Sequence, residues 1–259
     1  MTRIVYDSED QPHPSRLDSY RVWKKKGELD KARLEGYRNE FGGCRYCSGD
    51  ATVTLKREGE TRCVCWTLQK EFKYRKVQEL GTAHDKLEWK DFEVWGDSKS
   101  KAVLTSAVEE MRRWTKEFDS WLVLAGSVGT GKSHLLHTVD SYLKPWSLYL
   151  SVPDLKDLVF EYTGKKELQK LTDLISYHPI LLLDDIGAEY TSDYAVSMLR
   201  QIIMARYKRW EEYPTVIATN LGPSQLEHYD KRMADRLFDT AKVKDVVFEG
   251  VKSWRRYGN

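Results

Sequence analysis

The chain of 259 residues is long enough for one large domain, or for a medium-sized domain with a smaller one. Apolar residues make up 41% of it and aromatic residues 12%, a composition that excludes general disorder. The net charge of +2 is too small to indicate a nucleic-acid-binding protein by itself, so any such function has to rest on local patches.

The sequence also argues against export and membrane insertion. No apolar stretch approaches the roughly 20 residues that cross a bilayer. Residues 1–10 lack an apolar segment and carry three carboxylates, which is unlike a secretory signal. We therefore expect a cytoplasmic protein that has no contact with a membrane.

Residues 1–80 are expected to form a small N-terminal module. A polar tail is followed by a highly charged stretch, 16–41, whose apolar residues recur at loosely helical spacing. Gly42 and Gly43 end this pattern, and a segment that contains all four cysteines of the chain follows. Residues 81–100 are predicted to be an irregular linker to the rest of the chain.

The four cysteines form two closely spaced pairs: Cys44 and Cys47, then Cys63 and Cys65. Four thiolates on two short turns suit tetrahedral zinc, and alternating residues between the pairs predict a small hairpin, as in a zinc ribbon. A segment this short has little core of its own, so we expect a structural Zn²⁺ that contributes folding energy and no catalysis. Reduced cysteines, disulfides, an iron–sulfur cluster and replacement of one thiolate by His84 remain alternatives.

Residues 101–259 alternate strands with helices, a pattern typical of an α/β fold with a parallel sheet flanked by helices. Helical spacing predicts helices over 101–118, 132–142, 155–162, 167–177 and 193–210, with shorter ones at 224–228 and 231–238. Apolar runs predict strands over 121–125, 147–151, 180–184, 215–219 and 243–248. This segment is expected to be the main domain.

A glycine-rich segment lies between the first predicted strand and the next helix. It has the spacing of a phosphate-binding loop, and its residues are Gly126, Ser127, Val128, Gly129, Thr130, Gly131, Lys132 and Ser133. The amides of such a loop and the N-terminus of the helix can surround a phosphate group. Lys132 can reach the β- and γ-phosphates, and the Ser133 hydroxyl can bind Mg²⁺. The segment therefore predicts binding of ATP with Mg²⁺.

Polar residues end two later strands, at the edge where ligands bind in parallel sheets. Asp184 and Asp185 follow an apolar run of four residues. We expect Asp184 to hold Mg²⁺ through water and Asp185 to polarise the attacking water. The strand 215–219 ends in Thr219 and is followed by Asn220.

The order of phosphate loop, Asp-Asp strand and strand ending in Thr-Asn resembles the AAA+ ATPases. This resemblance implies that Asn220 contacts the γ-phosphate and the attacking water. Within the class, residues 182–189 resemble bacterial replicative helicase loaders of the DnaC/DnaI type, and the ATP-binding proteins of IstB-type transposition share the pattern. The resemblance covers about residues 85–256.

The resemblance extends to two arginine-bearing segments near the C-terminus. Residues 231–237 resemble the segment that supplies an arginine finger, for which Arg236 is the candidate and Arg232 the alternative. The terminal sensor arginine corresponds to Arg255, with Arg256 as the alternative. A finger that reaches a neighbouring subunit neutralises charge in the transition state, so the resemblance implies a catalytic role for Arg236.

Two departures from the common AAA+ pattern affect the expected activity. Asp185 lies where many AAA+ proteins have glutamate, so ATP hydrolysis is expected to be slow or stimulated by a partner, although helicase loaders share the aspartate. Few residues follow the last predicted strand, so we expect a reduced or absent lid domain, which fits these loaders.

The resemblance implies an ATP-dependent loader of a hexameric DnaB-type replicative helicase onto single-stranded DNA, active as a ring or spiral that is expected to be hexameric. The N-terminal module would bind the helicase. Basic residues near aromatic ones, at 70–76 and 162–170, are candidate contacts to single-stranded DNA, although such runs are usually solvated helix faces. The alternatives are an IstB-type ATP-dependent transposition regulator that forms filaments on DNA, and a DNA-binding adaptor that only retains the fold.

Overall fold

The structure, a computed structural model, describes residues 52–55, 59–62, 77–144, 146–187 and 193–257. The chain divides into two compact units, residues 1–76 and 77–259. In the first unit, β1 (Thr52–Leu55) pairs antiparallel with β2 (Gly59–Arg62). This hairpin lies between the two cysteine pairs, but the cysteines themselves lie outside the described residues. Among the described residues, no group of three or more His, Cys, Asp or Glu side chains is arranged to hold a metal ion.

The second unit is built on a five-stranded parallel sheet with the order β4-β5-β6-β3-β7. Its strands are β3 (Trp121–Ala125), β4 (Ser147–Ser151), β5 (Ile180–Ile186), β6 (Thr215–Thr219) and β7 (Val243–Val247). The first four are almost fully buried, whereas β7 at the edge is partly exposed. The parallel α/β prediction is therefore confirmed for this unit.

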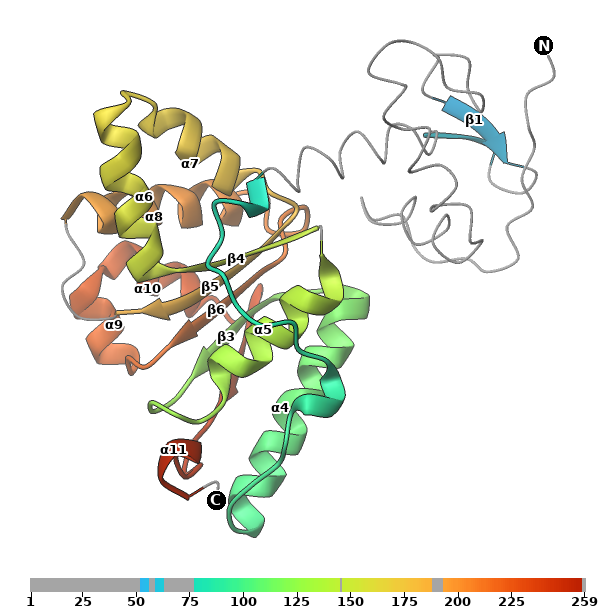
Figure 1. Cartoon of the computed structure of the whole chain (residues 1–259), viewed down its shortest axis with the longest axis vertical. Helices are drawn as coiled ribbons and strands as arrows, with labels where there is room; N and C mark the ends of the chain where they lie inside the picture. The colour runs from blue at the N-terminus through green and yellow to red at the C-terminus, as the bar shows by residue number, and fades with distance from the viewer. Residues whose placement is uncertain (1–51, 56–58, 63–76, 145, 188–192, 258–259) are drawn as a thin grey trace. The chain divides into compact units, whose positions relative to one another are not determined.

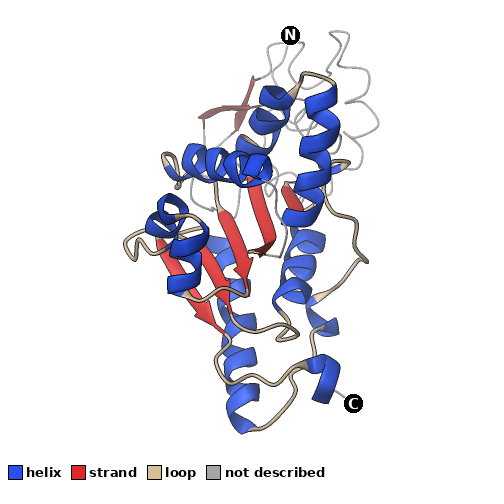
Figure 2. Cartoon of the chain, turned by 90° about the vertical axis from the view of Figure 1, so that its left-hand side faces the viewer, coloured by secondary structure: helices blue, strands red, loops and turns tan. Residues whose placement is uncertain are grey.

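Helices cover both faces of the sheet (Figures 1 and 2). On one face lie α4 (Ser98–Glu117) and α5 (Lys132–Leu143). On the other lie α6 (Val152–Gly164), α7 (Leu168–Ser176), α8 (Asp193–Tyr207), α9 (Pro223–Tyr229) and α10 (Lys231–Leu237). The short helix η2 (Trp89–Asp91) precedes α4, and α11 (Trp254–Tyr257) follows β7. No described helix has both the length and the apolar character that a membrane span needs.

The alternation of side chains along the strands separates the core from the site. Leu150 and Leu183 are fully buried in the core that α6 to α10 cover. Tyr149, one position away from Leu150, points to the opposite face. There its ring contacts the ring of His137 of α5, with 4.6 Å between the ring centroids. The face of the sheet that α5 covers therefore carries the polar side chains that take part in the candidate site.

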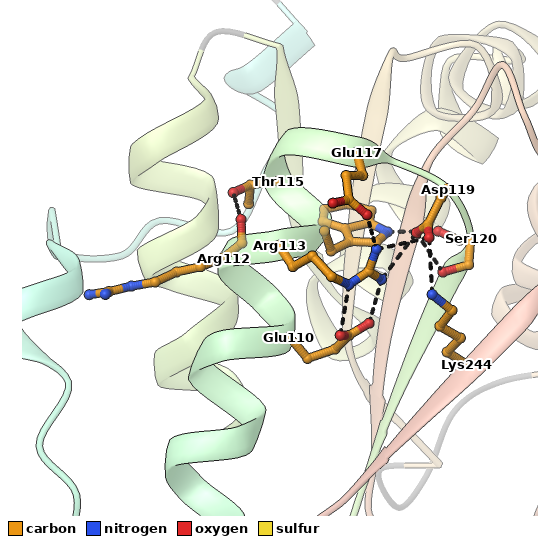
Figure 3. Close-up of polar contacts among 9 residues, drawn as sticks. Glu110, Arg112, Arg113, Thr115, Glu117, Asp119, Ser120 and Lys244 are labelled. Carbon is orange, nitrogen blue, oxygen red and sulfur yellow. Dashed lines mark hydrogen bonds and ion pairs between the residues drawn. The ribbon is translucent and has the colours of Figure 1, made fainter.

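An ion-pair cluster fastens the end of α4 to the edge strand (Figure 3). Arg113 lies within ion-pair distance of Glu110, Glu117 and Asp119. Asp119 also pairs with Lys244 of β7, at 3.0 Å. Because these side chains are partly exposed, each pair contributes little free energy by itself. The main effect of the cluster is to hold α4 in place against β7.

Arg206 joins α8, α7 and the start of β6 in the interior. Its guanidinium is fully buried and donates to the carbonyl oxygens of Ser176 and His178, at 3.1 and 2.6 Å, and of Pro214, at 2.8 Å. It also donates to the hydroxyl of Thr215, at 2.9 Å. These acceptors include carbonyls that the end of α7 leaves without a helical partner, and burial lowers the pKa of Arg206 to about 9.

Candidate nucleotide-binding site

The phosphate loop connects β3 to α5 and needs glycine at two positions. Gly129 and Gly131 have φ values of +80° and +94°, which L side chains rarely adopt. A Cβ at Gly129 would lie 2.3 Å from the Ser253 hydroxyl oxygen, and one at Gly131 would lie 2.8 Å from the Trp95 ring. The loop is therefore packed closely by two segments from outside it, and its backbone leads directly into the first turn of α5.

The Lys132 side chain is buried and ties the loop to the end of β6. Its Nζ donates to the carbonyl oxygens of Gly126 and Ser127, at 2.7 and 2.8 Å. It also donates to Oδ1 of Asn220, at 2.7 Å. Burial lowers the pKa of Lys132 to about 8, although the nearby carboxylates of Asp184 and Asp185 oppose this shift. The structure thus brings together the phosphate loop and Asn220, which were predicted from separate segments.

Asp184 and Asp185 leave β5 in different conformations. Asp184 is buried, and its two oxygens accept hydrogen bonds from the Tyr149 hydroxyl, at 2.8 Å, and the Asp185 amide, at 2.9 Å. Asp185 has a left-handed φ of +56°, at a point where the pairing of β5 with β6 shifts between Leu183 and Ile186. Burial and the adjacent Asp184 raise the pKa of Asp185, while Lys132 and Arg255 act in the other direction.

Lys132, Asp185 and Asn220 line a pocket of about 560 Å³, and Asp184 is not among its lining residues. Its polar wall contains the loop together with Asp185, Asn220 and Arg255. The rest of the lining comes mainly from the segment before α4 and from α11, and includes Asp91, Phe92, Glu93, Trp95 and Trp254. Phosphates suit the polar wall, since amides, an ammonium and a guanidinium converge there, and the aromatic residues provide flat apolar surfaces beside it.

The aromatic wall also holds α11 in position. The Trp95 indole donates to the carbonyl oxygen of Lys252, at 2.7 Å, and its ring contacts Trp254 edge-on, with 5.1 Å between ring centroids. The Trp254 amide donates to the carbonyl oxygen of Gly129, at 2.8 Å. Arg255 reaches the pocket because its neighbour Trp254 is bound to the phosphate loop itself.

Comparisons with known proteins show which folds this chain resembles. No protein-family model matches the chain. Over 111 residues, 42% of this chain, it is 25% identical to the replicative helicase loader DnaI of Bacillus subtilis (strain 168), and the match spans 35% of that protein's length. A crystal structure of DnaI is similar with a TM-score of 0.51 and 23% identity, over 67% of this chain and 93% of the other.

Two further solved structures share the fold. The DnaC helicase loader matches with a TM-score of 0.50 and 20% identity, over 62% of this chain and 95% of its own. AMPPCP-bound DnaA from Aquifex aeolicus matches with a TM-score of 0.52 and 21% identity, over 62% of this chain and 50% of its own. Residues of this chain therefore share the fold of the DnaI, DnaC and DnaA structures.

The candidate finger arginines lie outside the pocket of their own chain. Arg236, near the end of α10, pairs with Asp235 and lies over the Tyr207 ring, 5.3 Å from its centroid. Arg232, one turn earlier, is exposed, and neither arginine is among the residues that line the pocket. Of the two sensor candidates, Arg255 lines the pocket and Arg256 does not.

Three residues of this site escaped the sequence analysis: Tyr149, Trp95 and Trp254. Tyr149 bonds to a carboxylate 35 positions away, and Trp95 bonds to a carbonyl 157 positions away. Such contacts depend on strand order and on the path of α11, which no local motif encodes. The one available signal was an aromatic residue beside a predicted element: Trp95 shortly before the helix predicted from residue 101, and Trp254 next to the sensor arginine.

Proposed function

We propose that this AAA+ protein is an ATPase that loads a hexameric DnaB-type replicative helicase onto single-stranded DNA, with ATP binding and hydrolysis as its switch. The observation that supports the chemistry most directly is the convergence of Lys132, Asn220 and Asp185 on one pocket, with Asp184 beside them. The similarity to DnaI and DnaC supports the choice of the helicase as partner.

Each side chain has a role that follows from its chemistry. Lys132 exchanges its carbonyl and amide partners for the β- and γ-phosphate oxygens. Ser133 and Asp184 would hold Mg²⁺, which would neutralise charge on the phosphates. Asp185, whose pKa is raised by burial, orients the attacking water and accepts its proton. The water oxygen bonds to the γ-phosphorus, and the bond from that phosphorus to the β–γ bridging oxygen breaks.

The arginines complete the charge balance of the transition state. Arg255, on the pocket wall, acts on the phosphates bound by its own chain. Arg236 acts on the nucleotide of a neighbouring subunit, since it lies outside its own pocket. Hydrolysis would then require assembly into a ring or spiral of subunits, which we propose to be hexameric, and would be slow in the isolated chain.

The turn between α6 and α7 is the proposed contact for single-stranded DNA. Phe160 on α6 is 84% exposed, although it is a large aromatic residue that would normally be buried. Lys165 lies over the ring of Tyr162, at 5.2 Å, and Lys166 follows with a left-handed φ of 57°. An exposed ring beside lysines provides stacking and charge neutralisation for unpaired bases and their phosphates.

A binding experiment distinguishes this function from its competitor. The full-length chain is mixed with a DnaB-type helicase and ATP, and co-elution is measured, with Lys132→Ala as the variant that should lose ATP-dependent binding. Transfer of the helicase onto single-stranded DNA is then followed by unwinding activity. Failure to bind any such helicase, together with ATP-dependent filaments on duplex DNA, would instead support a transposition regulator.

A further inference from the structure

The register of two neighbouring strands places Tyr149 next to Asp184, the proposed ligand of Mg²⁺. In the parallel pairing of β4 and β5, Tyr149 lies opposite Leu182, and Ser151 lies opposite Asp184. Side chains two positions apart on a strand share a face, so Tyr149 and Asp184 lie on the same face of the sheet, one diagonal step apart. The tyrosine side chain is long enough to reach the Asp184 carboxylate from this position.

The hydrogen bond between these two side chains fixes the rotation of the carboxylate. The Tyr149 hydroxyl donates to Oδ2 of Asp184, at 2.8 Å, while Oδ1 accepts from the Asp185 amide, at 2.9 Å. A phenol carries its proton near neutral pH and a carboxylate can only accept, so the hydroxyl is the donor in this bond. With one donor on each oxygen, the carboxylate has a single orientation in which its remaining lone pairs are available.

The ring of Tyr149 is itself held from two sides. It contacts the rings of His84 and His137 edge-on, at centroid distances of 5.2 and 4.6 Å. These two imidazole rings stack on each other at 4.5 Å with 13° between their planes. Along the backbone, the Thr82 amide donates to the Tyr149 carbonyl oxygen, at 2.9 Å. The residues before α4 therefore add to the outer edge of β4 and enclose the tyrosine.

His84 is anchored rather than free to rotate. Its Nε2 lies 2.8 Å from Oδ2 of Asp140, its Nδ1 lies 2.7 Å from the carbonyl oxygen of Asp85, and the side chains of His84 and Asp140 are both 2% exposed. Because a carbonyl oxygen can only accept, Nδ1 carries a proton. Both ring nitrogens are thus engaged, which fixes the His84 ring beside Tyr149.

We propose that Tyr149 is a positioning residue that holds the Asp184 carboxylate in the orientation Mg²⁺ requires. The proposal rests on the proposed function, since it concerns the same magnesium–nucleotide site. Tyr149 does not touch the nucleotide; it acts through Asp184 alone. Outer hydrogen-bond partners of metal ligands typically change metal affinity by about 10- to 100-fold when they are removed, and this sets the size of the expected effect.

The test separates the magnesium contribution from nucleotide binding itself. Affinity for a fluorescent ADP analogue is measured with full-length protein in EDTA and in a Mg²⁺ titration, for the unchanged chain and for Tyr149→Phe. In EDTA, both proteins should bind the analogue with equal affinity. The Mg²⁺ concentration that gives half of the full effect on affinity should be about 10-fold or more higher for Tyr149→Phe than for the unchanged chain. Tyr142→Phe is the matched control, since it removes a phenol hydroxyl from a residue that is 53% exposed on the same face, outside the pocket.

A second comparison keeps the proposal testable if Tyr149→Phe is less stable. In an Asp184→Asn background the hydroxyl has no carboxylate to orient, so adding Tyr149→Phe should change the Mg²⁺ response less than two-fold. A Mg²⁺ response of Tyr149→Phe equal to that of the unchanged chain overturns the proposal, and so does an equal loss in both backgrounds. Absence of any nucleotide binding by the unchanged chain would instead overturn the proposed function.

Discussion

The ammonium group of Lys132 lies 2.7 Å from the side-chain oxygen of Asn220 and thereby connects the phosphate loop to the end of β6. A bound γ-phosphate competes with Asn220 for this ammonium. Nucleotide binding must therefore break or rearrange the bond, which makes the end of β6 sensitive to the state of the pocket. That relationship underlies the first prediction.

Asn220→Ala should separate nucleotide binding from hydrolysis. Lys132 retains its two carbonyl partners and its charge, so affinity for ATP should change only a few-fold. Hydrolysis should fall about 100-fold, a typical cost of removing one polar group that acts on a transition state. Calorimetric titration and phosphate release measure the two quantities. Lys132→Ala serves as the contrast, because it should abolish binding itself.

Nucleotide affinity should weaken in alkaline solution. The pKa of Lys132 is lowered to about 8 by burial, and the phosphates of a bound nucleotide raise it again. Above about pH 8 the free protein loses a proton that the complex retains, so the dissociation constant should rise by up to about tenfold per pH unit. ADP titrations at about pH 7 and about pH 9.5 measure this. Equal affinity at both values would mean that this ammonium does not contact the phosphates.

Arg236→Ala should leave ATP binding unchanged and remove hydrolysis only in the assembled protein. The expected loss is about 1,000-fold, as for other arginines supplied by a neighbouring subunit. Arg232→Ala is the matched control, since it changes an exposed arginine one turn away on the same helix. If the roles are exchanged, the control loses activity instead.

Mixing variants tests whether Arg236 acts between subunits. Lys132→Ala subunits cannot bind nucleotide but still supply the arginine, and Arg236→Ala subunits bind nucleotide but lack it. Their mixture should recover part of the activity that each lacks alone. No recovery in mixtures that demonstrably co-assemble would contradict the assignment.

The N-terminal cysteines should bind about one Zn²⁺ per chain. Elemental analysis of purified protein measures the metal, and the double variant Cys44→Ser, Cys47→Ser should lose it. Nucleotide affinity of the variant should stay unchanged, because residues 77–259 form a compact unit of their own. Iron with visible absorption in place of zinc would assign the cysteines to an iron–sulfur cluster.

Mild acid should destabilise the protein through two histidines. Burial lowers the pKa of His178 to about 3 and that of His137 to about 4, whereas an unfolded histidine titrates near 6.5. Between these values the unfolded chain binds protons that the folded protein does not, so stability falls as the pH falls below about 6.5. The slope is up to about 1.4 kcal/mol per pH unit for His178, and smaller for the less buried His137.

Urea unfolding at about pH 7.5, 6.5 and 5.5 measures this slope above the range in which most carboxylates titrate. His178→Asn is the informative variant, because an amide can donate to the Ile180 carbonyl oxygen as the imidazole Nδ1 does, at 3.1 Å. The His178→Asn variant should show a smaller change in the free energy of unfolding between the two lower pH values than the unchanged chain. An unchanged slope would show that His178 is protonated in the folded state.

The fold and the central part of the site could be predicted because their signals are local. The phosphate loop has a fixed spacing, and an apolar run such as 180–183 followed by carboxylates indicates a buried strand and its ligand end. Helix ends were less accurate. The helix predicted from residue 101 begins at Ser98, because Asp97 caps it by accepting a hydrogen bond from the Ser100 amide.

The surroundings of the site could not be predicted because they depend on packing between distant segments. The left-handed Asp185 follows from a shift in the pairing of β5 with β6, which requires knowledge that these strands are neighbours. The bond of Tyr149 to Asp184 similarly requires the β4–β5 register. Sequence patterns identify which groups carry the chemistry, whereas strand order determines which groups support them.

The position of β7 at the margin of the sheet limits how copies of this protein can associate. At the opposite edge of the sheet, the Thr82 amide already forms a hydrogen bond with the backbone of β4. The β7 margin carries Lys244 and Asp245 in its middle, and charged side chains of this kind discourage a second chain from extending a sheet. In the proposed ring, subunits are therefore expected to meet through side-chain contacts, so that they could separate without breaking the hydrogen bonds of a shared sheet.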